Sequence, residues 1–186
     1  YAYRNWQQSN PVNVQKGPVK FSSDNLGVVE LIADQSTLGA VYAGTYFNYK
    51  LYAQVTKPGT QSSLEGLYTV DMNDGTRTLI STNGVHLVEM TYDYTTNTMY
   101  GIKNGAEYLM TLDLNTGETK QIGAFQTSTM SVYMLALACH VDGTMYGIST
   151  DDNLYRIDKA TAACTLIGAT GVNAAFTPVS YTHLRA

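Results

Sequence analysis

Glu89 and Asp93, two carboxylates four residues apart, are the pair whose type and spacing could support acid and base catalysis. Paired carboxylates cleave glycosidic bonds, one acting as the acid and the other as the base or nucleophile. The surrounding letters, LVEMTYD, predict a β-strand, on which residues i and i+4 share a face but lie about 13 Å apart. Because this separation is too large for both to act on one bond, at most one of them belongs to a site completed from elsewhere in the chain.

Three further aspartates, Asp71, Asp113 and Asp158, each end an apolar stretch and begin a turn. The letters DMNDG and DLNTG resemble part of a calcium loop, but the distant bidentate glutamate of that loop is missing. An Asx-type turn, in which the carboxylate accepts hydrogen bonds from backbone N–H groups, explains these aspartates more simply. We therefore predict a structural role for them and no calcium site.

His86 and His140 are the histidines that could take part in a site, and they show no HxxxH or CxxC spacing. A zinc site would need ligands that converge from distant parts of the chain. A structural or surface histidine is the simpler interpretation, so the sequence predicts neither a bound metal nor a cofactor.

The composition limits the class of partner. Charged residues make up 14% of the 186 residues, and the net charge of −4 arises from scattered Asp and Glu. Nucleic acids and anionic membranes both require a concentrated basic face, so they are disfavoured as partners. No apolar run approaches the roughly eighteen residues that cross a bilayer, so membrane insertion is not expected.

The pentapeptide TMYGI occurs twice, at 98–102 and 144–148, and indicates an internal repeat. Each copy is followed by an apolar strand, a polar turn and a strand ending in Ile, and two earlier stretches fit the same template. The closing isoleucines, Ile32, Ile80, Ile122 and Ile167, are separated by 48, 42 and 45 residues. A period of forty-odd residues with several strands in each unit is typical of β-propeller blades.

Alternation and turn signals predict four strands in each unit, with TMYGI as the second. The fold class is therefore all-β, an arc of four-stranded antiparallel blades in an incomplete ring. We expect a partial blade over residues 1–34, whole blades over 37–82, 85–125 and 130–170, and a stub of the next strand over 171–177.

The two cysteines fall on the first and fourth strands of the last blade. Three strand spacings would separate Cys139 from Cys164 by about 14 Å, beyond the roughly 7 Å Cα limit for a disulfide. We therefore predict two free, buried thiols, and no nucleophilic cysteine, because neither has an obvious histidine partner.

The C-terminal residues do not continue the repeat. The letters VSYTHLRA, at 179–186, resemble the translation of a transposase-type sequencing adaptor. We expect residues 178–186 to be a non-native tail, and the source to be a fragmentary gene from metagenomic DNA.

With the blades placed, the chain resembles bacterial repeat propellers of the YVTN, Kelch and WD-repeat kind. It is most similar to secreted or surface-anchored propeller proteins of gut-type bacteria whose blades carry MTYDYTTNTMYGI followed by LDLNTGE. The resemblance implies a propeller fold and an extracellular or cell-envelope location, but no agreed activity.

Loop length and aromatic residues predict where a ligand would bind. The loops between the second and third strands vary in length and open on the same face as the links between blades. Trp6 begins one of these loops, whereas His86 and Tyr133 lie in the links, and such aromatics could stack on sugars or anchor a protein. The sequence thus favours a non-catalytic binding or scaffold module of an exported bacterial protein, with a glycan or surface protein as partner. The alternative is a carbohydrate-active hydrolase or lyase that uses Glu89 or Asp93 in the central channel.

Overall fold

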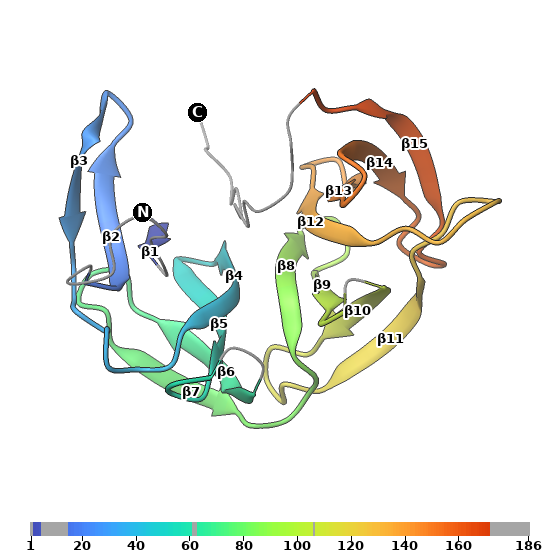
Figure 1. Ribbon diagram of the computed structural model, residues 1–186. Coiled ribbons are helices and arrows are strands. Elements are labelled where there is room, and N and C mark those ends of the chain that lie inside the picture. Colours follow the sequence, from blue (N-terminus) through green and yellow to red (C-terminus); the bar gives the residue numbers. More distant parts are fainter. Residues whose placement is uncertain (1, 5–14, 61–62, 106, 172–186) are drawn as a thin grey trace.

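A computed structural model describes residues 2–4, 15–60, 63–105 and 107–171. Within these ranges every regular element is a β-strand, and no helix is long and apolar enough to cross a membrane. The strands form four antiparallel sheets that stand side by side in an open arc (Figure 1). The all-β propeller arc expected from the repeat is confirmed.

Each sheet consists of consecutive strands, ordered from the centre of the arc to its rim. The first sheet has three strands: β1 (Ala2–Arg4), β2 (Gly17–Ser22) and β3 (Asn25–Leu31). The second has four: β4 (Val41–Phe47), β5 (Lys50–Thr56), β6 (Leu64–Val70) and β7 (Arg77–Ser81). The third contains β8 (Leu87–Asp93), β9 (Thr98–Lys103), β10 (Tyr108–Leu112) and β11 (Thr119–Ala124). The fourth contains β12 (Met134–Cys139), β13 (Met145–Ser149), β14 (Asn153–Ile157) and β15 (Cys164–Ala169).

The core lies between the sheets, because the two faces of a blade pack against different neighbours. Met99 belongs to the apolar cluster shared with the second sheet, whereas the next residue, Tyr100, belongs to the cluster shared with the fourth. Alternate side chains of a strand point to opposite faces, so consecutive residues pack against different neighbouring blades. This packing explains why TMYGI recurs.

In the same motif, Gly101 allows Leu87 and the backbone of Glu89 to pack closely against it, because glycine has no Cβ atom. A Cβ atom there would lie 2.7 Å from Leu87 Cδ1 and 2.8 Å from the backbone oxygen of Glu89. We therefore expect Gly101→Ala to lower the free energy of unfolding by about 1–2 kcal/mol, through overpacking. Urea unfolding of this variant beside Gly27→Ala, whose new Cβ would meet nothing closer than 3.4 Å, measures the effect. Equal stability of the two variants would contradict it.

The turns between third and fourth strands are Asx turns, as predicted. Asp71 Oδ1 accepts a hydrogen bond from the Asn73 N–H at 2.7 Å. Asp113 Oδ1 accepts two from the turn backbone, at 2.8 and 2.9 Å, and Asp158 Oδ1 accepts two at 2.8 and 3.0 Å. These bonds hold the pKa of Asp113 and of Asp158 below the ordinary value. Within the described ranges, no group of three His, Cys, Asp or Glu residues could hold a metal ion.

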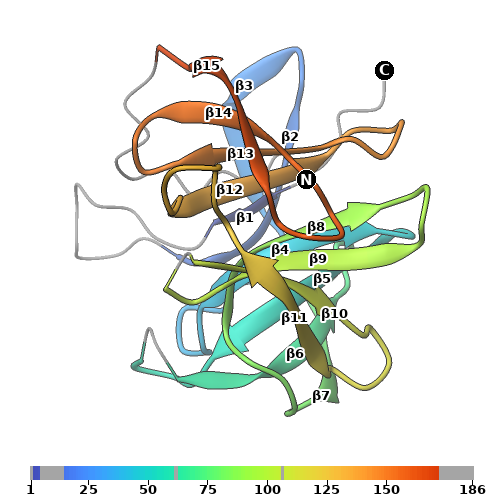
Figure 2. The same cartoon turned by 90° about the vertical axis from the view of Figure 1, so that its right-hand side faces the viewer.

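The same turns join neighbouring blades. The chain leaving each outermost strand contacts the turn of the next sheet: Gln35 Nε2 donates to the Gly75 oxygen at 2.5 Å, and Asn83 Nδ2 donates to the Thr116 oxygen at 3.3 Å. Farther along, the Cys164 N–H donates to the Gln126 oxygen at 2.7 Å. Figure 2 shows the sheet twist that allows this contact, with β11 and β15 running steeply across the direction of β8 and β12.

Candidate functional site

The two faces of the arc carry different connections. The loop face carries the links between blades and the loops between second and third strands; the turn face carries the turns between first and second and between third and fourth strands. Each face presents aromatic side chains, so each is a candidate for ligand binding.

On the loop face, His86 and Tyr133 occupy equivalent positions on neighbouring blades. The backbone oxygen of His86 accepts a hydrogen bond from the Asn104 N–H at 2.8 Å, and that of Tyr133 accepts one from the Thr150 N–H at 2.9 Å. Ala40 holds the same position in the second sheet, where its oxygen accepts from the Thr56 N–H at 2.9 Å. The repeat thus places an aromatic ring at two of three equivalent positions. Trp6 lies outside the described residues.

His86 is half-buried and packs against Tyr42, a residue that the sequence analysis did not select. The two rings meet edge to face, with centroids 4.5 Å apart, and the Asn104 side-chain amide lies 3.4 Å from His86 Nδ1. Tyr133 is 48% exposed, so its ring is available to a partner. The sequence signal for Tyr42 as an aromatic residue of the loop face was its position at the start of the first strand of its blade.

Asp93, one of the two catalytic candidates, is fully buried at the turn-face end of β8. Its Oδ1 accepts from the Thr95 N–H at 2.9 Å and the Thr95 hydroxyl at 2.7 Å, and its Oδ2 accepts from the Thr96 hydroxyl at 2.8 Å. Lys159, from the fourth sheet, completes an ion pair at Oδ2. Burial alone would raise the pKa of Asp93, but these donors outweigh it and hold the pKa far below its ordinary value. The carboxylate therefore stays ionised and occupied, as a joint between blades.

Glu89, the other candidate, lies on the innermost strand of the third sheet and is 3% exposed. A β-bulge shared by β4, β8 and β12, the innermost strands of the three four-stranded sheets, places it in register with Ala43 and Ala136. Its Oε1 accepts a hydrogen bond from the Met90 N–H at 3.1 Å. Since Asp93 is engaged by Lys159, the structure does not combine the two carboxylates into one site.

Cys139 and Cys164 are free and buried, as predicted. Burial is the largest cause that raises the pKa of the Cys139 thiol to about 12 and that of Cys164 to about 11. Thiols with such pKa values are protonated at neutral pH, so neither is a nucleophile.

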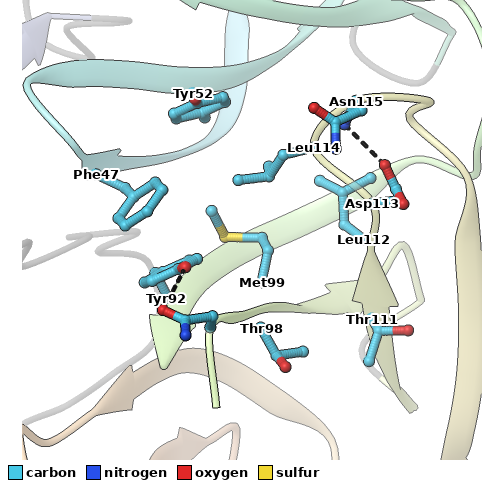
Figure 3. A pocket seen from close by; sticks show the side chains of 11 residues that line it. Phe47, Tyr52, Tyr92, Thr98, Met99, Thr111, Leu112, Asp113, Leu114 and Asn115 are labelled. Atoms are coloured by element: carbon cyan, nitrogen blue, oxygen red, sulfur yellow. Dashed lines mark hydrogen bonds between the residues drawn. The ribbon is translucent and has the colours of Figure 1, made fainter. Parts of the chain in front are cut away.

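The turn face has a hollow of about 530 Å³ between the second and third sheets (Figure 3). Phe47 and Tyr52 form its wall on the second sheet, and Phe47 stacks on Tyr92 of the third sheet, with centroids 3.6 Å apart and an interplanar angle of 24°. Polar side chains from the third sheet complete the lining: Asn97, Thr98, Thr111, Asp113 and Asn115. This hollow was not expected from the sequence, although the aromatic residues in YFNYK and YDYTTN were a signal for it.

Comparison with known proteins finds related folds but no related sequence family. No family model matches the chain, and no curated protein matches it. Regucalcin, a calcium-binding protein from Agrobacterium tumefaciens, is similar over 80% of this chain and 52% of its own, with a TM-score of 0.52 and 15% identity. The shared feature is the β-propeller fold.

Two further solved structures extend the likeness. An auxiliary nutrient binding protein from Bacteroides ovatus has a TM-score of 0.55 and 13% identity, over 76% of this chain and 34% of its own. A luciferin-regenerating enzyme has a TM-score of 0.53 and 11% identity, over 77% of this chain and 52% of its own. The propeller arc therefore spans about half the length of regucalcin and of the luciferin-regenerating enzyme. Binding proteins and enzymes both occur among these neighbours, so the fold alone does not assign a function.

Proposed function

We propose that this propeller arc is a non-catalytic binding module of an exported bacterial protein, and that its loop face recognises a glycan or another surface protein. The observation that carries the proposal is the equivalence of His86 and Tyr133, which place rings on neighbouring blades where the second sheet has Ala40. The backbone hydrogen bond does not require a ring at this position, because the Ala40 oxygen accepts the same bond. Aromatic side chains in such places supply large contact area to sugars and proteins.

The enzyme alternative would have to rest on Glu89. Asp93 accepts hydrogen bonds from Thr95 and Thr96 and an ion pair from Lys159, so it has no proton to give and little freedom to take one. A single carboxylate does not supply both the acid and the base that glycoside cleavage uses. No observation favours the hydrolase or lyase over the binding module.

Titration of the protein with soluble arabinoxylan, pectin and mucin glycans, followed by calorimetry, tests the proposal. We expect saturable binding to at least one of them without release of reducing ends. His86→Ala and Tyr133→Ala should each weaken that binding about tenfold, since each removes a ring from the contact. Tyr49→Ala is the matched control, because Tyr49 is 87% exposed on the opposite face. Unchanged affinity in both loop-face variants, or cleavage of the glycan, would contradict the proposal.

A further inference from the structure

The strand register makes the contacts between blades directly comparable. Phe47 and Asp93 both end the first strand of their blade, six residues after the residue that precedes the shared bulge. Leu114 and Lys159 both follow the Asx aspartate of their turn. Phe47 and Leu114 at the joint between the second and third sheets therefore correspond to Asp93 and Lys159 at the joint between the third and fourth.

The two joints differ in how these positions are filled. Between the third and fourth sheets, the Asp93 carboxylate and the Lys159 ammonium meet in an ion pair that bridges the blades. Between the second and third sheets, two apolar residues stand in their places, and the hollow lies there. The side chains that line it also change: Asn97 and Asn115 replace Gly143 and Ala160 of the other joint. The joint that contains the hollow therefore has two polar side chains that the joint between the third and fourth sheets lacks.

The hollow combines an apolar wall with hydrogen-bonding groups of both kinds. The Asp113 carboxylate lines the hollow, the Asn115 side-chain amide has no hydrogen-bond partner among the described residues, and Asn97 uses only its Oδ1, as acceptor from the Tyr92 hydroxyl at 3.3 Å. Backbone hydrogen bonds hold the pKa of Asp113 below its ordinary value, so this carboxylate is an acceptor at neutral pH. Among the residues that the structure describes, no lysine, arginine or histidine lines the hollow, so these residues offer an anionic ligand no counter-ion.

We infer that this hollow binds a neutral sugar unit, with the ring's apolar face against Phe47 and Tyr52 and its hydroxyl groups bonded to Asn97, Asp113 and Asn115. Its volume of about 530 Å³ falls within the range of roughly 300–1,000 Å³ usual for small-molecule sites. Hydroxyl groups both donate and accept hydrogen bonds, which suits a lining of one carboxylate and two amides. The site lies on the opposite face from His86 and Tyr133, and it stands independently of the function proposed for that face.

Side-chain amide resonances of Asn97 and Asn115, followed by NMR, test the site directly. The probes are methyl glucoside, methyl galactoside and N-acetylglucosamine, and each is compared with a matching oligosaccharide to distinguish a free sugar from a chain end. We expect saturable shifts at both amides with at least one probe. Asn97→Gly and Asn115→Ala, which copy the other joint, should each weaken binding about tenfold. Asn97 already has a φ of +53°, so glycine fits its backbone.

Asn73→Ala is the matched control, because Asn73 holds the position of Asn115 in the preceding turn and lies outside the hollow. The double variant Phe47→Asp with Leu114→Lys should abolish binding, since it copies the ion pair of the other joint. No saturable shift with any sugar, or equal affinity in Asn115→Ala and Asn73→Ala, would overturn the inference. Shifts produced by choline instead of the sugars would also overturn it, because they would indicate an aromatic site for a cation. His86→Ala and Tyr133→Ala should leave these shifts unchanged, so failure here is distinct from failure at the loop face.

Discussion

Replacing Lys159 with methionine is expected to lower the free energy of unfolding by about 3 kcal/mol at pH 7, because it leaves a buried carboxylate without its counter-ion. Asp93 is fully buried, and Lys159 is its ion-pair partner across the joint between the third and fourth sheets. The two threonines that also bond to Asp93 carry no charge, so they do not replace the ammonium group. Urea denaturation of the variant and the parent protein measures the difference.

The effect should depend on pH with a definite sign. In the parent protein the pKa of Asp93 is depressed below 3.8, so its stabilising contribution is present above about pH 4 and is lost as the pH falls through the lower, folded value. Without Lys159, the pKa of Asp93 loses one of the causes that lower it and rises toward its ordinary value, so the carboxylate of the variant takes up a proton at a higher pH than that of the parent protein. We therefore expect the stability gap between the two proteins to be widest at neutral pH and to narrow as the pH falls below about 4.

Lys20→Met provides the matched control. Lys20 pairs with Glu30 at 2.9 Å, but the two side chains are 50% and 64% exposed. Water screens such a pair, so its loss should change stability by no more than about 0.5 kcal/mol. Equal losses in Lys159→Met and Lys20→Met, or a gap that does not change with pH, would show that the Asp93 ion pair does not determine the stability of its joint.

Replacing Arg77 with methionine should destabilise the joint between the first and second sheets by about 2–3 kcal/mol. Arg77 Nε donates to Gln35 Oε1 at 2.9 Å, Nη1 donates to the Gly39 oxygen at 2.8 Å, and Nη2 donates to the Tyr3 hydroxyl. The guanidinium carbon also lies 5.7 Å from the centre of the Tyr3 ring. Methionine fills part of the space but removes a donor from all three acceptors, of which Gln35 Oε1 keeps the Tyr3 hydroxyl as a second donor, at 2.8 Å.

Hydrogen exchange resolves where this loss appears. Blades contact only their neighbours, so protection should fall first in β2 and β3 and remain near the parent level in β13 and β14. Arg156→Met is the control, because Arg156 is an exposed arginine in β14. Loss of protection spread evenly over all four sheets would argue that the arc unfolds as one unit.

Much of the fold could be predicted from the sequence because each blade repeats the same packing arrangement. The recurrence of TMYGI indicated an equivalent second strand in two blades, and the structure confirms it with β9 and β13. The free thiols followed from strand order alone, since Cys139 lies on the innermost and Cys164 on the outermost strand of one sheet. Structural features that recur in every blade can thus be recognised in the sequence.

The candidate sites were less predictable, because they depend on which residues meet across a joint. Asp93 was considered with Glu89, its neighbour in sequence, but its partner is Lys159, 66 residues away. The hollow likewise brings Phe47 beside the turn that contains Leu114. A comparison of equivalent positions would have shown an acidic and a basic residue at one joint and two apolar residues at the other. That paired change is present in the sequence, but only the strand register shows that the two positions are equivalent at both joints.

The contact between an outgoing chain and the next turn also has an evolutionary consequence. Gln35 bonds to Tyr3 of the first sheet and to Gly75 and Arg77 of the second, and Asn83 bonds to the turn at Thr116, so residues of the two adjoining units close each of these blade boundaries. After duplication of an ancestral unit, a substitution at one boundary is tested by selection without disturbing the others. Ala162 illustrates this freedom, because it adopts a φ of +65° where the earlier turns have Gly75 and Gly117. The arc can therefore acquire new specificities one boundary at a time while its architecture is inherited unchanged.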